Sequence, residues 1–167
     1  MSNSDNPRNG AIFQHQVMEW FRKHYQLDFE LKKKLPIGCP PKDHKFDIVD
    51  KGNTIAIECK RYTWTVTGNV PSAKMGFANE AAFYLSFLPD SYQKYIVMLY
   101  SFHQKRQETL AEYYYRTNRH LLGSIKVAEY DQSVIIYRSL DLMFKSLRKE
   151  SKQTYIEEGH YGTTKHF

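Results

Sequence analysis

Cysteine is scarce in this chain of 167 residues, which contains only Cys39 and Cys59. Neither belongs to a Cys-x-x-Cys pair, so the sequence has no zinc-binding cysteine pattern and no disulfide framework. Long apolar runs are missing as well: residues 1–10 are polar, and no stretch approaches the roughly 18 apolar residues that a membrane-spanning helix needs. We therefore expect a cytoplasmic protein in a reducing compartment, with no membrane among its partners.

An excess of acidic residues is also absent, because 24 Lys and Arg outnumber 18 Asp and Glu and give a net charge of +6. Such a surplus suits a polyanionic partner, since each phosphate that a protein neutralises releases counterions. The 13 tyrosines include rings that can offer stacking surfaces to nucleic-acid bases. Charge alone does not identify the partner, because many basic proteins bind no nucleic acid.

The length and the hydrophobic content of 41% predict one globular domain. We expect this domain to span residues 10–148, between a flexible segment, 1–9, and a polar, mobile tail, 149–167. The expected helices cover residues 10–24, 73–88, 108–122 and 140–148. The expected strands cover residues 27–31, 45–50, 54–62, 95–102, 125–130 and 134–138, and the Pro-rich stretch 35–43 is expected to be a loop. This order predicts an α/β protein whose mixed β-sheet is flanked by helices.

The clearest local pattern is a β-hairpin around Gly52 and Asn53. Glycine at the first central position is typical of a two-residue type II′ turn. With that turn, Asp47 lies opposite Glu58 on the neighbouring strand. Directly opposed residues point to the same face of a sheet, with Cβ atoms about 5 Å apart. The hairpin therefore predicts a pair of neighbouring carboxylates.

The same register places Lys45 opposite Lys60. Because side chains alternate along a strand, Glu58 and Lys60 share one face, and Cys59 turns to the other, toward the core. Asp47, Glu58 and Lys60 are therefore expected to converge.

Two carboxylates at this distance repel each other, and a divalent cation would remove the conflict. Oxygen ligands of this kind suit Mg²⁺ or Mn²⁺. Lys60 could then orient or deprotonate a water molecule, or stabilise charge that develops on a phosphate. A solvated strand face with an ordinary Glu–Lys pair is the alternative, and spacing alone leaves both interpretations open.

The motif resembles that of the PD-(D/E)XK nuclease superfamily, which includes restriction endonucleases and Holliday-junction resolvases. Here it reads Phe46-Asp47, ten residues, then Glu58-Cys59-Lys60, with Phe46 in place of the usual proline. The expected order of elements from about residue 10 to about residue 102 is also similar to that family's core. The resemblance implies a restriction-endonuclease-like sheet with core order α-β-β-β-α-β. It further implies a metal held by Asp47, Glu58 and the backbone carbonyl of Cys59, with Lys60 positioning the attacking water.

The family often has Gly-x-x-x-Glu in its first helix. This sequence has Gly10 and then Gln14 at the position of the glutamate. The resemblance therefore assigns Gln14 to the site as a neighbour of the metal ligands.

A basic and aromatic loop, 61–74, leaves the strand that carries Lys60. It could contact phosphates and stack on a base, with the start of the next helix receiving a phosphate. The alternative is a helix capped by Ser72 and a packed Trp64. The candidate nucleic-acid contacts are Arg61, Tyr62, Trp64, Asn69, Ser72, Lys74, Lys45, His103, Lys105 and Arg106.

Three further features favour structural interpretations. Glu80-x-x-x-Tyr84 has the spacing of a motif known in some relatives, but its first residue differs, so it is expected to be helix surface and core. The run 32–34 of three lysines is expected to be a solvated basic stretch. A lone His44 near Asp47 is expected to have no catalytic role.

The sequence and the resemblance together predict an Mg²⁺- or Mn²⁺-dependent endonuclease that acts on DNA as a homodimer. The alternatives are a protein that binds nucleic acid, or assembles, without cutting, and a hydrolase of another substrate.

Overall fold

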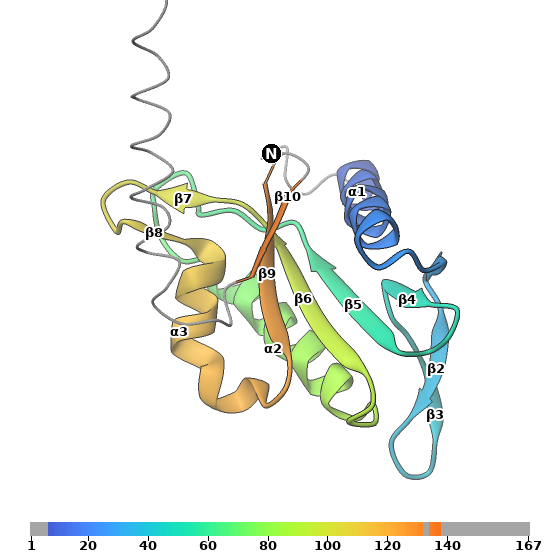
Figure 1. The fold of residues 1–167 in the computed structure, drawn as a ribbon. Helices are drawn as coiled ribbons and strands as arrows, with labels where there is room; N and C mark the ends of the chain where they lie inside the picture. The colour runs from blue at the N-terminus through green and yellow to red at the C-terminus, as the bar shows by residue number, and fades with distance from the viewer. Residues whose placement is uncertain (1–6, 132–133, 138–167) are drawn as a thin grey trace, which may run out of the picture.

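The computed structural model describes residues 7–131 and 134–137 of the chain. Its centre is a six-stranded sheet in the order β1-β4-β5-β6-β9-β10 (Figure 1). The strands of this sheet are β1 (Phe29–Leu31), β4 (Ile48–Asp50), β5 (Ile55–Lys60), β6 (Gln93–Leu99), β9 (Lys126–Asp131) and β10 (Val134–Tyr137). The helices are α1 (Pro7–Tyr25), α2 (Ser72–Ser86) and α3 (Leu110–Leu122). Two small ribbons pair β2 (Lys34–Ile37) with β3 (Lys42–Lys45), and β7 (Phe102–His103) with β8 (Glu108–Thr109).

The central sheet is mixed. β1, β4 and β5 form an antiparallel meander, β5, β6 and β9 are parallel, and β10 returns antiparallel to β9. Helix α2 connects β5 to β6 and helix α3 connects β6 to β9, as parallel neighbours require. The expected α/β class with a mixed sheet and flanking helices is thus confirmed.

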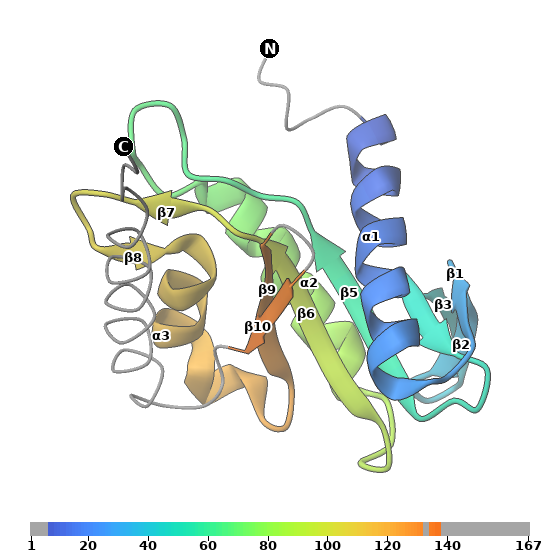
Figure 2. The ribbon, with the colours of Figure 1, turned by 45° about the horizontal axis from the view of Figure 1, so that its top comes forward.

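Each face of the sheet has its own apolar core, because the strands are buried on both sides. Helix α1 covers one face with Phe13, Val17 and Phe21, which pack with strand residues that include Cys59. Helices α2 and α3 cover the opposite face (Figure 2). Cys59 therefore turns into the core beneath α1, as its position between Glu58 and Lys60 predicted.

Residues 35–43 were expected to be a loop, but they belong to the ribbon of β2 and β3. Pro36 pairs with Asp43 in this ribbon. Proline is tolerated there because some backbone N–H groups of a two-stranded ribbon face away from the partner strand. The expected strand 45–50 is correspondingly broken by a bend at residues 46 and 47. Lys45 pairs with Lys34, and the prediction that it opposes Lys60 is wrong.

The turn between β4 and β5 also differs from the type II′ turn that was expected. The N–H of Asn53 donates to the Asp50 carbonyl at 3.1 Å, so Lys51 and Gly52 are the central residues, and Asn53 takes the left-handed φ of 58°. The Asp50 carboxylate decides this geometry because it accepts from the N–H of Thr54 at 2.7 Å. The register is nevertheless the expected one.

That register pairs Ile48 with Ile57 and Val49 with Ala56. Ile48 and Ile57 belong to the core beneath α1. Val49 and Ala56 belong to the opposite core, so a slip by one residue would exchange the side chains of two differently packed cores. The hydrophobic pattern thus fixes the pairing even though the turn type was wrong.

The starts of two helices correct further expectations. Helix α1 begins at Pro7, inside the segment 1–9 that was expected to be flexible. The residue that precedes α2 is Pro71, and Ser72 makes no side-chain cap there. The helix expected at 140–148 and the tail 149–167 lie outside the described residues, as do residues 1–6. Among the described residues, no helix is long and apolar enough to cross a membrane.

Candidate functional site

Asp47 lies in the bend just before β4, beside the last pair of the β4–β5 ladder. Its carboxylate Oδ2 accepts a hydrogen bond from the N–H of Cys59 at 2.9 Å. The side chain thus continues the ladder where the backbone of β4 has turned away. Asp47 meets β5 through this carboxylate–backbone contact and not as a regular cross-strand partner of Glu58.

The other oxygen of Asp47 connects three segments that are distant in the sequence. Oδ1 accepts from Nε2 of Gln14 on α1 and from Nζ of Lys32, both at 2.8 Å. Lys32 follows β1 and has the left-handed φ of 56°, a backbone conformation that is uncommon outside glycine. Gln14 is therefore at the site, and Lys32 is a site residue that the sequence did not reveal, because nothing in a run of three lysines distinguishes the one that turns inward.

Glu58 and Lys60 form an ion pair in which Nζ lies 2.8 Å from Oε2. The side chains are only 8% and 14% exposed, respectively. A solvated strand face, the alternative for this pair, is therefore excluded. Charges this well covered need partners, and the pair is held against Asp47.

The electrostatics of the pair indicate which group holds a proton. Burial raises the pKa of Glu58, and the negative charge of Asp47 raises it further, against the opposing effect of Lys60. Burial lowers the pKa of Lys60, but the charge and hydrogen bond of Glu58 outweigh this, so that the pKa of Lys60 is raised. Lys60 therefore remains an ammonium at neutral pH. In this state it can orient a water molecule or a phosphate, but it cannot accept a proton.

Glu58 and Lys60 line a pocket of about 260 Å³ that lies between β3, β5 and α2. The ring of His44 stacks on Tyr84 at a centroid distance of 3.8 Å. Three residues that were expected to have only structural roles, His44, Glu80 and Tyr84, thus line the pocket together with Glu58 and Lys60. The residues that line it are His44, Lys45, Glu58, Lys60, Tyr62, Phe77, Glu80, Ala81 and Tyr84.

The candidate nucleic-acid contacts fall into two groups. Lys45 and Tyr62 line the pocket itself, and Lys74 lies 5.9 Å from the centre of the Tyr62 ring. Arg61 is half-buried beside them in the chain, and Ser72 is exposed at the start of α2. Of this group, Lys45 of β3 and Tyr62 after β5 therefore share the pocket with Glu58 and Lys60.

The second group is built around Trp64. Its indole is only 9% exposed and donates to the Ser101 carbonyl at 2.9 Å, so it is a packed residue and presents no free face to a base. Arg106 lies over its ring at 5.2 Å, and His103 meets it edge to face. Lys105 is exposed in the turn of the same β7–β8 ribbon.

Asn69 belongs to a tight turn that packs on this ribbon. Its N–H donates to the Thr65 hydroxyl at 2.8 Å. Gly68 in the same turn has φ of 77°, and a Cβ there would lie 2.5 Å from Nε2 of His103. The positive φ and this close approach both favour glycine, so the loop after β5 packs against the β7–β8 ribbon. His103, Lys105 and Arg106 of the ribbon are called the basic surface below.

Metal coordination would need more than side chains. No three His, Cys, Asp or Glu side chains of residues 7–131 and 134–137 gather closely enough to hold an ion by themselves. Asp47 and Glu58 supply two carboxylates. Because the N–H and C=O of a strand residue project to the same side, the carbonyl of Cys59 lies on the edge of β5 whose N–H donates to Asp47. An all-oxygen set of this kind fits Mg²⁺ or Mn²⁺.

Lys32 occupies a lone pair of Asp47 that a cation could use, so the two should compete. We expect Lys32→Ala to tighten Mn²⁺ binding about two- to fivefold, since a half-exposed ion pair contributes at most about 1 kcal/mol. Isothermal titration calorimetry measures the change. Lys34→Ala, which removes an exposed lysine of β2, should leave the affinity unchanged. Weaker Mn²⁺ binding by Lys32→Ala would mean that Lys32 supports the site instead of competing for it.

As the pH is lowered, the affinity of Asp47 and Glu58 for Mn²⁺ should begin to fall at a higher pH than the affinity of an exposed carboxylate site. Burial raises the pKa of Glu58, so this group keeps its proton up to a higher pH, and a proton and a cation compete for the same oxygens. Affinity is therefore present above the raised pKa and falls as the pH drops through it, by about tenfold per pH unit once the protonated form dominates. Titrations from about pH 8 to about pH 5 test this, and a constant affinity over that range would contradict it.

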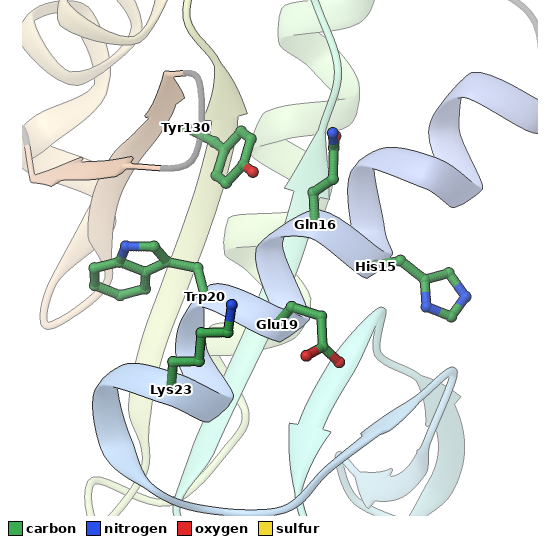
Figure 3. Close-up of a pocket in the computed structure, with 6 residues that line it drawn as sticks. All are labelled: His15, Gln16, Glu19, Trp20, Lys23 and Tyr130. Atoms are coloured by element: carbon green, nitrogen blue, oxygen red, sulfur yellow. The ribbon is translucent and has the colours of Figure 1, made fainter.

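A second hollow lies along α1 and is separate from this cluster. Figure 3 shows its lining side chains, which include His15, Glu19 and Trp20 of α1 and Tyr130 of β9. None of the carboxylate–lysine residues lines it. It lies on the helix surface and shares no residue with the pocket beside Lys60.

Comparison with known proteins finds no relative for the chain. No protein-family model matches it, and no curated protein or solved structure is similar enough to count as a match.

Proposed function

We propose that the protein is a metal-dependent nuclease of the PD-(D/E)XK type, with Asp47, Glu58 and Lys60 as its reactive centre. The observation that carries the proposal is the largely buried Glu58–Lys60 pair, with Lys60 Nζ 2.8 Å from Glu58, beside the carboxylate of Asp47 in the bend before β4. Removing a charge from water costs on the order of several kcal/mol in a protein, so a sheet that holds two carboxylates and a lysine largely away from water is better explained by a functional role. The fold would then be restriction-endonuclease-like, with α1, the β1–β4–β5 meander, α2 and β6 as its core.

The chain's own groups would divide the work. Asp47, Glu58 and the Cys59 carbonyl would hold a divalent cation, which polarises a phosphodiester and lowers the pKa of water when it is bound. Lys60 would orient the attacking water and offset charge on the phosphate, since it keeps its proton. Gln14 would fix the orientation of the Asp47 carboxylate through its hydrogen bond of 2.8 Å.

Nucleic acid is the proposed substrate, with DNA preferred. The basic surface supports this. Arg106 and His103 contact Trp64, which belongs to the loop that follows β5, and Lys105 is exposed beside them in the turn of the β7–β8 ribbon. A homodimer would supply two sites for two strands.

A second candidate is a protein that binds nucleic acid without cutting it. One observation favours it: both oxygens of Asp47 already accept protein hydrogen bonds, and Lys32 and Lys60 neutralise the two carboxylates without a metal. A site of this kind can be stable as a purely structural cluster.

One experiment separates these functions. The purified protein is incubated with supercoiled, linear and branched DNA and with RNA, in Mg²⁺, Mn²⁺ or EDTA. Cutting that requires a divalent cation supports the nuclease. Binding without cutting in either metal contradicts it and favours the second candidate.

A further inference from the structure

The pocket beside Lys60 has aromatic walls. Phe77, Ala81 and Tyr84 line it from α2, at the spacing of four and then three residues that places them on one face of a helix. The small side chain of Ala81 leaves space between the two rings. His44 lies flat against Tyr84, with an angle of 22° between the ring planes, so the wall is two rings deep.

The charges of the pocket are divided in a way that suits a base better than a phosphate. Glu80, exposed one turn after Phe77, lines it on the side of α2, away from the Glu58–Lys60 ion pair on β5. Carboxylates repel phosphate but accept hydrogen bonds from the N–H groups on the edges of nucleobases. Lys45 and Lys60 line the same pocket and can face the backbone phosphate that accompanies the base.

We infer that this pocket holds one unpaired nucleobase of the substrate, stacked on the aromatic side chains of α2 and β3. The inference rests on the proposed nuclease function, because that function places the scissile phosphate at Lys60. The volume of about 260 Å³ lies below the roughly 300–1,000 Å³ of pockets for drug-sized ligands, and it suits a single base.

This inference narrows the class of substrate. A paired base can enter a pocket walled by protein rings only if it is flipped out of its duplex, which costs a few kcal/mol of stacking and pairing energy. The pocket therefore favours a substrate with a nucleotide that is single-stranded, or unpaired in a bulge, flap or branch. Intact duplex would bind only through its phosphates, on the basic surface.

Phe77→Ala tests the inference directly. Phe77 is 55% exposed, so the loss of its side chain should not impair folding. Affinity is measured by fluorescence anisotropy in EDTA, with single strands of DNA and of RNA, a fully paired duplex, and a duplex with one unpaired nucleotide. We expect Phe77→Ala to weaken binding of the probes with unpaired bases about 5- to 150-fold, as loss of base stacking does, and to leave duplex binding unchanged.

Phe83→Ala is the matched control. Phe83 lies on the same helix, is 59% exposed and lines a different hollow, so its removal should change no affinity. A series of strands that each lack one base adds a second test. Wild-type protein should bind more weakly to the strand that lacks the base held in the pocket. Phe77→Ala should bind that strand no more weakly than it binds the complete strand. The inference is overturned if wild-type protein does not prefer unpaired nucleotides, if Phe77→Ala affects duplex equally, or if it behaves as Phe83→Ala does.

Failure of this inference and failure of the proposed function give different results. Metal-dependent cutting with no selective effect of Phe77→Ala would leave the nuclease standing without a base pocket. Selective binding through Phe77, with no cutting in Mg²⁺ or Mn²⁺, would leave the pocket standing on a protein that does not cleave.

Discussion

Replacing Lys60 by alanine should lower metal-dependent cleavage about 10²- to 10⁴-fold, the usual contribution of a positioned group in proton transfer or charge stabilisation. Lys60 is the only ammonium within 2.8 Å of the Glu58 carboxylate among the ion pairs of the described residues. Its removal also leaves Glu58 buried without its cation, which raises the pKa of Glu58 further and weakens metal binding. Initial cleavage rates at saturating Mg²⁺ and Mn²⁺ measure the loss.

Two variants make the Lys60 result specific. Lys34→Ala removes the same charge from an exposed position of β2 and should keep the wild-type rate. Lys60→Arg keeps a positive charge but spreads it over a planar group, so its rate should lie between those of wild type and Lys60→Ala. Thermal unfolding of all three verifies that they fold. Cleavage by Lys60→Ala at the wild-type rate would remove Lys60 from the proposed centre.

The hairpin that carries Glu58 and Lys60 could be predicted because its signals are short-range. Ile55 and Ile57 face the core beneath α1 and Ala56 faces the opposite core, so the alternation along β5 also places Glu58 and Lys60 on one face. Together with this packing, the short turn after Asp50 sets the register. The turn type could not be predicted, because it depends on what the Asp50 carboxylate accepts.

The rest of the site depends on contacts that sequence patterns do not encode. Lys32 reaches Asp47 because the chain takes a left-handed turn after β1, and His44 reaches Tyr84 because the ribbon of β2 and β3 folds beside α2. Both are encounters between distant segments. Gln14 was singled out only through the resemblance, and the structure shows that it donates to Asp47 at 2.8 Å, while its role beside a metal stays a prediction.

The second large effect should come from Asp50, a carboxylate that is close to the site in sequence but has a different role. Asp50 is buried, and its oxygens accept from the N–H groups of Thr54 at 2.7 Å and Ile55 at 2.6 Å and from the Thr54 hydroxyl at 3.0 Å. Asp50→Ala leaves two backbone donors without an acceptor. We expect it to lower the free energy of unfolding by about 3 to 5 kcal/mol, because hydrogen bonds to charged groups are strong and the orphaned donors are expensive to bury. Urea denaturation measures this loss.

Asp28→Ala and Asp50→Asn bracket that result. Asp28 is an exposed carboxylate whose ion pairs with Arg22 and Lys51 lie at the surface, so its removal should change the free energy of unfolding by less than about 1 kcal/mol. Asp50→Asn keeps one oxygen for the two N–H groups, and its loss should be smaller than that of Asp50→Ala. Equal stability of Asp50→Ala and wild type would contradict the structural role.

Asp50 and Asp47 should therefore separate stability from activity. In Asp50→Ala the buried isoleucines still hold the register, so the folded fraction keeps Asp47 beside Cys59 and should cleave at close to the wild-type rate per folded molecule. Asp47→Ala gives up the bonds that Asp47 accepts from the Cys59 N–H, from Gln14 and from half-exposed Lys32. Only the first of these donors is a backbone group and the two side chains can turn to water, so most of the stability should remain while cleavage is lost. If both variants lost activity only in proportion to unfolding, Asp47 would be a structural residue like Asp50, and the carboxylate cluster would have no catalytic role.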